Sequence, residues 1–296
     1  MLATPGPLPT GPDWCYEVKW DGMRLLADRS ERGLRLASRT DRDMTRHFPE
    51  LAGLTELAPD VLLDGEAVTL VGGVPSFAAL ADRFHRVPTE AEVAARPVVY
   101  LVFDVLRLYG VPLTERPLSE RRATLERLEL HAVPNLRLSP AYDDGEALLT
   151  ATKAQGLEGV VAKRRTAAYL PGRRSPAWVK VAHRRTQDCL VGGWRPERTH
   201  PSRIGGLLLG VADPAGGGLR FAGRVGSGVA GEAMQRALRE ALVAAPESPF
   251  VSPLPREDAA EAHWCEPTLL VEVSHSGWTD GYRLRHPVLA RLRRDR

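Results

Sequence analysis

The first 186 residues alternate short apolar runs with polar turns. The run VVYLVFDVL at Val98–Leu106 is almost continuously apolar, which is typical of a strand buried on both faces. Shorter strands are predicted at Trp14–Trp20, Leu34–Ser38, Val61–Leu63, Val160–Lys163 and Trp178–Val181. Residues 1–12 are rich in Pro and Gly, and we expect them to form a lead-in strap.

Two stretches of the same region have helical spacing. Arg116–Leu130 reads as an amphipathic helix with Ser119 as its N-cap. Gly145–Gln155 reads as a second helix, which Gly156 ends. Helices mixed with strands in this way indicate an α+β or α/β domain.

The pattern changes near residue 186, where short strands separated by glycines begin. These strands are expected at Cys189–Trp194, Gly206–Ala212, Leu219–Val225 and Leu269–Ser274, with one helix at Gly231–Ala244. Short strands with turn signals and a single helix are typical of a small Greek-key barrel of the OB type. We therefore expect two domains, residues 1–186 and 187–296.

Length and composition fit this division. A chain of 296 residues is long enough for two domains, and 43% hydrophobic with 26% charged residues is ordinary for a globular protein. No apolar run approaches the ~18 residues of a membrane span, and no secretory signal is visible. Three widely spaced cysteines form no zinc signature or disulfide framework, so we expect a cytoplasmic protein.

The basic residues are unusual in kind. The net charge of +3 is only a weak hint of a polyanionic partner. Of the 40 basic residues, however, four are lysines: Lys19, Lys153, Lys163 and Lys180. A GC-rich genome explains the bias towards arginine. Each remaining lysine is nonetheless a candidate for chemistry that arginine cannot perform, such as losing a proton and acting as a nucleophile.

Lys19 stands at the end of a predicted strand, in the string Glu17-Val18-Lys19-Trp20-Asp21-Gly22-Met23-Arg24. A lysine with a pKa of about 10.4 must lose its proton before it can attack phosphorus. On its own, a lysine between two acids is most often a surface ion pair. The surrounding motifs change this reading.

The string resembles the Lys-x-Asp-Gly signature of ATP-dependent DNA ligases, RNA ligases and mRNA capping enzymes. Further motifs of this nucleotidyltransferase superfamily follow in the family's order. They are Leu36-Ala37-Ser38-Arg39, Leu63-Asp64-Gly65-Glu66, Val102-Phe103-Asp104, Glu158-Gly159-Val160-Val161-Ala162-Lys163 and Trp178-Val179-Lys180-Val181. Ordered matches of this kind make coincidence an unsatisfactory explanation.

The chain most resembles the bacterial ligases of non-homologous end joining, which are often modules of larger polymerase–ligase proteins. The strings Tyr169-Leu170-Pro171-Gly172-Arg173-Arg174-Ser175 and Arg285-His286-Pro287 support this resemblance, which covers almost the whole chain. It implies an α+β fold, with an adenylation domain of antiparallel sheets and flanking helices followed by an OB-fold barrel. It also implies sealing of nicks or ends in duplex DNA through a lysyl–AMP intermediate, in double-strand break repair.

The resemblance gives each candidate residue a role. Lys19 is the expected nucleophile and forms the lysyl–AMP. Nucleotide-binding roles fall to Glu17 at the adenine end, Arg24 and Arg39 at ribose or phosphate, Phe103 stacked on adenine, and Lys163 and Lys180 at the α-phosphate. Glu158 and Glu66 are the candidate ligands for Mg²⁺ or Mn²⁺, with Glu66 alternatively bound to the ribose. Asp64 either supports these ligands or is structural.

Two departures from the family pattern leave alternatives open. The fifth motif has Ala182 where the family often has a second lysine, and His183, Arg184 or Arg185 would have to replace it. The last motif would rely on Arg285 and the cluster Arg291–Arg296. An RNA ligase, a capping-type enzyme, or a weakly active DNA-end scaffold are the alternatives to a DNA ligase.

The same resemblance suggests the partners. We expect a monomer that acts on nicked or broken duplex DNA and associates with the nucleoid. A Ku-like end-binding protein and a separate polymerase and phosphoesterase would assist it.

Overall fold

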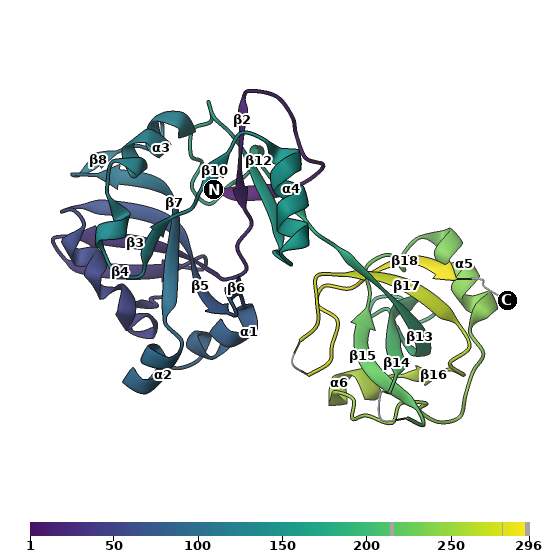
Figure 1. The fold of residues 1–296 in the computed structure, drawn as a ribbon. Coiled ribbons are helices and arrows are strands. Elements are labelled where there is room, and N and C mark those ends of the chain that lie inside the picture. The colour runs from purple at the N-terminus through teal and green to yellow at the C-terminus, as the bar shows by residue number, and fades with distance from the viewer. Residues whose placement is uncertain (214–215, 280, 294–296) are drawn as a thin grey trace. The chain divides into compact units, whose positions relative to one another are not determined.

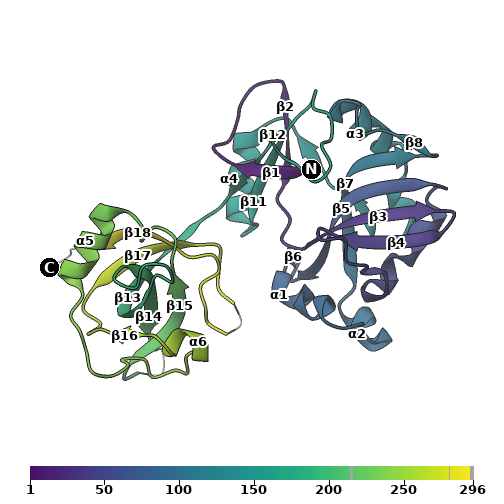
Figure 2. The ribbon, with the colours of Figure 1, turned by 180° about the vertical axis from the view of Figure 1, so that it is seen from behind.

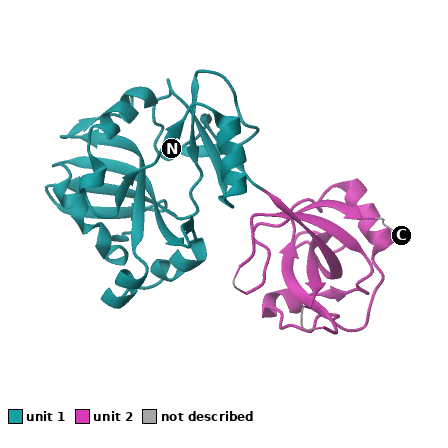
Figure 3. Cartoon of the chain, in the orientation of Figure 1, with its two compact units in different colours: residues 1–183 teal, residues 184–296 magenta. Residues whose placement is uncertain are grey.

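The computed structural model describes residues 1–213, 216–279 and 281–293. The chain forms two compact units, residues 1–183 and 184–296 (Figure 3). Strand β13 (Arg185–Pro196) begins in the second unit, so the boundary expected after residue 186 falls inside a strand. No helix in the described part of the chain is long and apolar enough to cross a membrane.

The larger sheet of the first unit has seven strands in the order β4-β3-β5-β7-β8, with β6 beside β5 and β9 beside β7 (Figure 1). All pairs are antiparallel except β7 and β9. The strands are β3 (Met23–Ser30), β4 (Gly33–Ser38), β5 (Val61–Val71), β6 (Val74–Pro75), β7 (Val98–Leu108), β8 (Val111–Pro112) and β9 (Leu136–Leu138). The predicted buried strand at Val98–Leu106 is confirmed, because β7 is buried over most of its length.

Strand β3 was not predicted from the sequence. Its start depends on Gly22, because a Cβ there would lie 2.2 Å from the carbonyl oxygen of Ala67. Glycine therefore allows β3 to begin in close contact with β5.

The second sheet of this unit has the order β1-β12-β11-β2-β10. The strands are β1 (Leu2–Pro5), β2 (Trp14–Val18), β10 (Ala141–Tyr142), β11 (Gly159–Arg164) and β12 (Arg174–Ala182). β1 pairs in parallel with β12 and forms the edge of the sheet (Figure 2). The expected lead-in strap is thus partly wrong, since its first residues form a strand.

Short helices flank the two sheets. They are α1 (Phe77–Leu80), α2 (Glu90–Ala95), α3 (Leu118–Glu126) and α4 (Gly145–Ala154), with 3₁₀ helices η1 (Thr45–His47), η2 (Pro49–Glu56), η3 (Ala81–Phe84) and η4 (Leu130–Ala132). The N-cap predicted at Ser119 is wrong, because α3 begins at Leu118 and its cap is Pro117. The first backbone N–H groups of α3 donate instead to the carbonyls of Arg165 and Ala167, which replace a side-chain cap.

The apolar residues form separate cores. The largest core fills the space between the seven-stranded sheet and the 3₁₀ helices around η2, and a second lies between the five-stranded sheet and α4. A smaller cluster contains Phe103, Leu106, Tyr169 and Trp178. It joins the two sheets, because Phe103 lies on β7 and Trp178 lies on β12.

The second unit is an antiparallel sheet in the order β15-β14-β13-β17-β18, with β16 beside β13. Its elements are β13, β14 (Ile204–Ala212), β15 (Leu219–Val225), α5 (Glu232–Ala241), α6 (Arg256–Ala259), β16 (His263–Trp264), β17 (Leu270–His275) and β18 (Val288–Arg293). A bridge between Ser227 and Val288 connects the segments that follow β15 and begin β18. The expected α+β first domain and OB-type second domain are both confirmed, with α5 shorter at each end than predicted.

Candidate active site

A pocket in the first unit gathers most of the candidate residues. The five-stranded sheet contributes Glu17, Lys19, Lys163 and Lys180, and the seven-stranded sheet contributes Arg24, Glu66 and Phe103. Ala3 of strand β1 and Trp178 of β12 also line this pocket. Residues distant in sequence therefore meet at one cavity between two sheets.

Lys19 follows directly after β2 and forms an ion pair with Glu158. Its backbone N–H donates to the carbonyl of Gly159 at 2.9 Å. Gly159 has a φ of 145°, and a Cβ there would lie 2.1 Å from the carbonyl oxygen of Val181. Only glycine fits this close approach of β11 to β12, which places Glu158 beside Lys19.

One end of the pocket is aromatic. The rings of Phe103 and Trp178 meet edge to face, with centroids 6.0 Å apart. The Nζ atom of Lys163 lies 4.3 Å from the Phe103 ring centroid and 4.6 Å from that of Trp178. The same amine donates to Oε1 of Glu17 at 2.8 Å. Lys163 thus lies at the aromatic end, whereas the sequence reading assigned it to the α-phosphate.

Arg24 is held in place by a buried carboxylate. Its Nε and Nη2 atoms donate to the two oxygens of Asp64 at 2.9 and 2.6 Å. The hydroxyl of Tyr169 donates to the same carboxylate at 2.7 Å and accepts from Arg24 at 3.2 Å. Asp64 is fully buried, so in this structure it orients Arg24. Tyr169 was not identified as a candidate from the sequence, although it lies in one of the strings that carry the resemblance.

Two candidates do not line the pocket, Arg39 and Glu158, although Glu158 pairs with Lys19. Arg39 is exposed just beyond the end of β4. Burial and the charge of Lys19 lower the pKa of the Lys180 amine, and the charges of Arg174 and then Arg39 contribute smaller parts of the same shift.

His183 makes other contacts and does not supply the cation missing at Ala182, and Arg184 and Arg185 belong to the second unit. His183 donates its backbone N–H to the Glu158 carbonyl at 2.8 Å, and its Nε2 atom lies 2.8 Å from the hydroxyl of Thr152 in α4. Arg184 donates to the hydroxyl of Ser274 at 3.1 Å. The fifth motif consequently presents Lys180 to the pocket as its only lysine.

The structure describes only part of the predicted C-terminal basic cluster. Arg291 and Arg293 lie on β18 and pair with Glu272 on β17, at 2.8 and 3.3 Å. Arg285 follows β17, where its backbone N–H donates to the carbonyl of Gly277. Arg294, Asp295 and Arg296 lie outside the described residues.

Burial raises the pKa of Glu66 to about 8, although the charges of Lys19 and Arg24 oppose this shift. The protonated carboxyl is therefore favoured at neutral pH in this fold. The stability that this shift contributes is fully present below about pH 4.5 and is lost as the pH rises through 8.

We therefore predict that the unfolding free energy of the nucleotide-free protein falls between pH 5 and 8 relative to that of Glu66→Gln. The relative slope should be at most about 1.4 kcal/mol per pH unit, the value for one proton. Urea denaturation at several pH values measures it. Parallel pH profiles for the two proteins would show that Glu66 ionises in the fold as in the unfolded chain.

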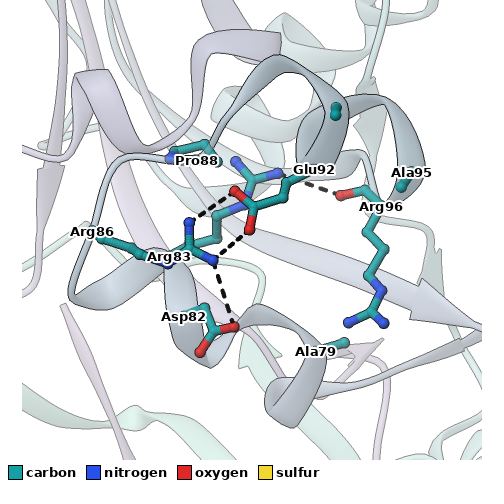
Figure 4. Close-up of a pocket in the computed structure, with 9 residues that line it drawn as sticks. Ala79, Asp82, Arg83, Arg86, Pro88, Glu92, Ala95 and Arg96 are labelled. Carbon is teal, nitrogen blue, oxygen red and sulfur yellow. Dashed lines mark hydrogen bonds and ion pairs between the residues drawn. The ribbon is translucent and has the colours of Figure 1, made fainter.

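Another hollow lies around η3 and α2 (Figure 4). Several of its charged groups are paired, because Arg86 bonds Glu92 and Arg83 bonds Glu50. Arg83 also donates to the backbone carbonyl of Arg96 at 3.4 Å. Because these arginines neutralise neighbouring carboxylates, we assign no reaction to this hollow.

Comparison with known proteins identifies the family to which the chain belongs. Residues 8–182 match the ATP dependent DNA ligase domain, and residues 200–296 match the ATP dependent DNA ligase C terminal region. Together these two matches cover most of the chain. The chain therefore belongs to the ATP-dependent DNA ligase family, and the resemblance inferred from its motifs is confirmed.

Within the family, the chain is similar to LigD proteins. It is 40% identical to the multifunctional non-homologous end joining DNA repair protein LigD of Mycobacterium tuberculosis, over the whole chain but only 38% of that protein. It is 35% identical to LigD of Pseudomonas aeruginosa, over 96% of the chain and 34% of that protein. The crystal structure of the M. tuberculosis LigD ligase domain matches with a TM-score of 0.57 and 38% identity, covering 100% of this chain and 94% of that one.

Proposed function

We propose that this protein joins DNA strands by transferring AMP from ATP to Lys19 and then to the DNA 5′ phosphate. The observation that carries the proposal is the single pocket in which Lys19 meets an aromatic end, two further lysines and an arginine. A solved structure of a mycobacterial DNA ligase D, 38% identical to this chain, is a complex with ATP, which supports ATP as the nucleotide.

In the first step, the Nζ atom of Lys19 attacks the α-phosphorus of ATP. A P–N bond forms, the bond from the α-phosphorus to its bridging oxygen breaks, and pyrophosphate leaves with the electron pair. The amine must release its proton in this step. The carboxylate of Glu158 forms an ion pair with this amine in the structure. We therefore infer that the Glu158 carboxylate accepts or orients the proton of Lys19 when no metal ion is bound to Glu158.

The other pocket residues position the nucleotide. We infer that the base lies against Phe103, with the carboxylate of Glu17 at its edge, since both lie at the aromatic end. Arg24, fixed by Asp64, is placed to bind the ribose or a phosphate, because a guanidinium held by a carboxylate keeps a fixed direction. Lys180 lines the same pocket as Lys19 and would balance the negative charge of the phosphates. Arg39 would bind the 5′ phosphate of the break.

A divalent cation fits this donor set. Glu158 and Glu66 offer carboxylate oxygens, and Mg²⁺ is commonly held by one or two carboxylates together with substrate phosphates. The described residues contain no group of three or more His, Cys, Asp or Glu side chains that could hold a metal ion by themselves. When bound, Mg²⁺ or Mn²⁺ would neutralise negative charge on the phosphates.

Two further displacements at phosphorus complete the proposed reaction. The 5′ phosphate of the break attacks the lysyl–AMP and releases Lys19, forming a DNA adenylate. The 3′ hydroxyl then attacks the activated 5′ phosphate, which closes the phosphodiester and expels AMP. Throughout, the chain contributes mainly position and positive charge.

The biological setting is also a proposal. The chain spans 38% of the length of the M. tuberculosis relative, which is named as a multifunctional end-joining protein. We propose that this chain seals double-strand breaks as a monomer associated with the nucleoid. A Ku-like end-binding protein, a polymerase and a phosphoesterase would supply the remaining activities.

The proposal is tested by incubating the protein with α-labelled ATP or GTP and then with nicked duplex DNA and Mg²⁺ or Mn²⁺. We expect label on the protein from ATP and sealed DNA. Label from GTP alone would identify a capping-type enzyme, and sealing of nicked RNA only would identify an RNA ligase. DNA binding without label or sealing would identify an end scaffold, consistent with Ala182.

A further inference from the structure

A hydrogen-bonded chain behind the pocket fixes the orientation of Glu17. The indole N–H of Trp20 donates to the hydroxyl oxygen of Ser139 at 3.0 Å. That hydroxyl donates to Oε2 of Glu17 at 3.2 Å. Trp20 and Glu17 line the pocket, whereas Ser139 is completely buried behind them.

The polarity of this chain follows from its chemistry. An indole N–H can only donate, so Ser139 must accept from Trp20. The hydroxyl has one proton, and this proton is therefore directed at Glu17. Lys163 donates to the other oxygen of Glu17 at 2.8 Å, and Nη1 of Arg122 lies 3.6 Å from that oxygen. Every polar neighbour in this group thus presents a proton or a positive charge to the carboxylate.

In this arrangement the Glu17 carboxylate can accept further hydrogen bonds. A carboxylate has about four lone-pair positions, and the two hydrogen bonds occupy two of them. The remaining positions can accept only from a ligand that donates. The 6-amino group of adenine donates, whereas the 6-oxo group of guanine or hypoxanthine would place oxygen against oxygen.

The position of Ser139 is tied to the aromatic end of the pocket. Its backbone N–H donates to the carbonyl of Val102 at 2.8 Å, and Val102 precedes Phe103 on β7. Its carbonyl accepts from Nη2 of Arg122 at 2.5 Å. Ser139 consequently sets the carboxylate relative to the ring on which the base would stack.

We propose that Ser139, held by Trp20 and Arg122, is a positioning residue that presents Glu17 to the 6-amino group of the purine and so selects ATP. This inference rests on the proposed function, because it takes the pocket to be the nucleotide site. It assigns base discrimination to a residue that does not itself line the pocket.

The test compares ATP with purine riboside triphosphate, which lacks the 6-amino group. Dissociation constants are measured by calorimetry in the Lys19→Ala background, so that no turnover is needed. We expect Ser139→Ala to weaken ATP binding about tenfold and to weaken binding of the analogue less than about twofold. Trp20→Phe, which keeps an aromatic side chain and removes the indole N–H donor, should produce the same selective loss at about threefold.

Thr152→Val is the matched control, since it also removes one buried hydroxyl but lies in α4 away from the pocket. It should leave the ratio of the two constants unchanged. Equal weakening of both nucleotides by Ser139→Ala would overturn the proposal and leave a purely structural role. If Ser139→Ala shows no cooperative thermal transition, an unchanged ratio in Trp20→Phe overturns the proposal instead.

Failure of the proposed function gives a different result. In that case neither nucleotide binds the Lys19→Ala protein, with or without further substitutions. Selective binding of ATP that is insensitive to Ser139 and Trp20 would retain the ATP site and reject only the positioning role.

Discussion

Replacement of Lys19 by alanine is expected to abolish the AMP adduct and to reduce nick sealing by at least about 10³-fold. Alanine has no amine to form the P–N bond. Lys19→Arg should fail as well, because a guanidinium remains protonated in proteins. Intact mass after incubation with ATP is the measurement, and the unmodified sequence should gain the mass of one AMP.

Lys153→Ala is the control for this experiment, because Lys153 is an exposed lysine near the end of α4 and does not line the pocket. This variant should form the adduct and seal DNA as the parent does. An adduct on the Lys19→Ala protein would assign the nucleophile to another residue.

The largest effect on stability is expected from Arg121→Met. Arg121 on α3 donates from Nε and Nη2 to both oxygens of Asp104 at 2.8 Å, and both side chains are completely buried. Removing the guanidinium leaves a buried, unpaired carboxylate, which costs about 3–5 kcal/mol of unfolding free energy. Urea denaturation at neutral pH measures the loss.

Two companion variants separate charge from packing. Arg116→Met removes an exposed arginine whose ion pair with Glu120 spans 3.7 Å, and should change stability by less than about 1 kcal/mol. Arg121→Met combined with Asp104→Leu should recover most of the loss, since replacing both charges by apolar groups removes the unpaired carboxylate. No recovery in the double variant would mean that packing around α3, rather than the charge, determines the cost.

Much of the fold was accessible from local patterns. The apolar run at Val98–Leu106 and the glycine after the helix at Gly145–Gln155 both signal their elements directly. Strand β3 was missed because its sequence, MRLLADRS, has no clear alternation, and its pairing depends on the close contact at Gly22. The cap of α3 was misplaced because distant backbone carbonyls satisfy its N–H groups, and no local pattern reports them.

In the candidate site too, local sequence identified some residues, whereas others depend on contacts with distant parts of the chain. The motifs identified Lys19 and Glu17 because these residues lie in one short string. Ser139 and Tyr169 could not be found in that way, since each acts through a partner more than 100 residues away in the chain. Sequence motifs therefore named most of the charged residues that line the pocket, whereas the roles of Ser139 and Tyr169 behind it required the three-dimensional structure.

Three of the four lysines line one pocket, and residues 184–296 contain none. This distribution determines how the protein responds to amine-directed reagents. An N-hydroxysuccinimide dye or cross-linker finds no lysine side chain on the second unit, and outside the pocket it finds only Lys153. Outside the pocket, lysine-directed labelling or immobilisation would therefore attach at the exposed Lys153 of α4, and the buried thiols of Cys15, Cys189 and Cys265 offer no alternative in the folded chain.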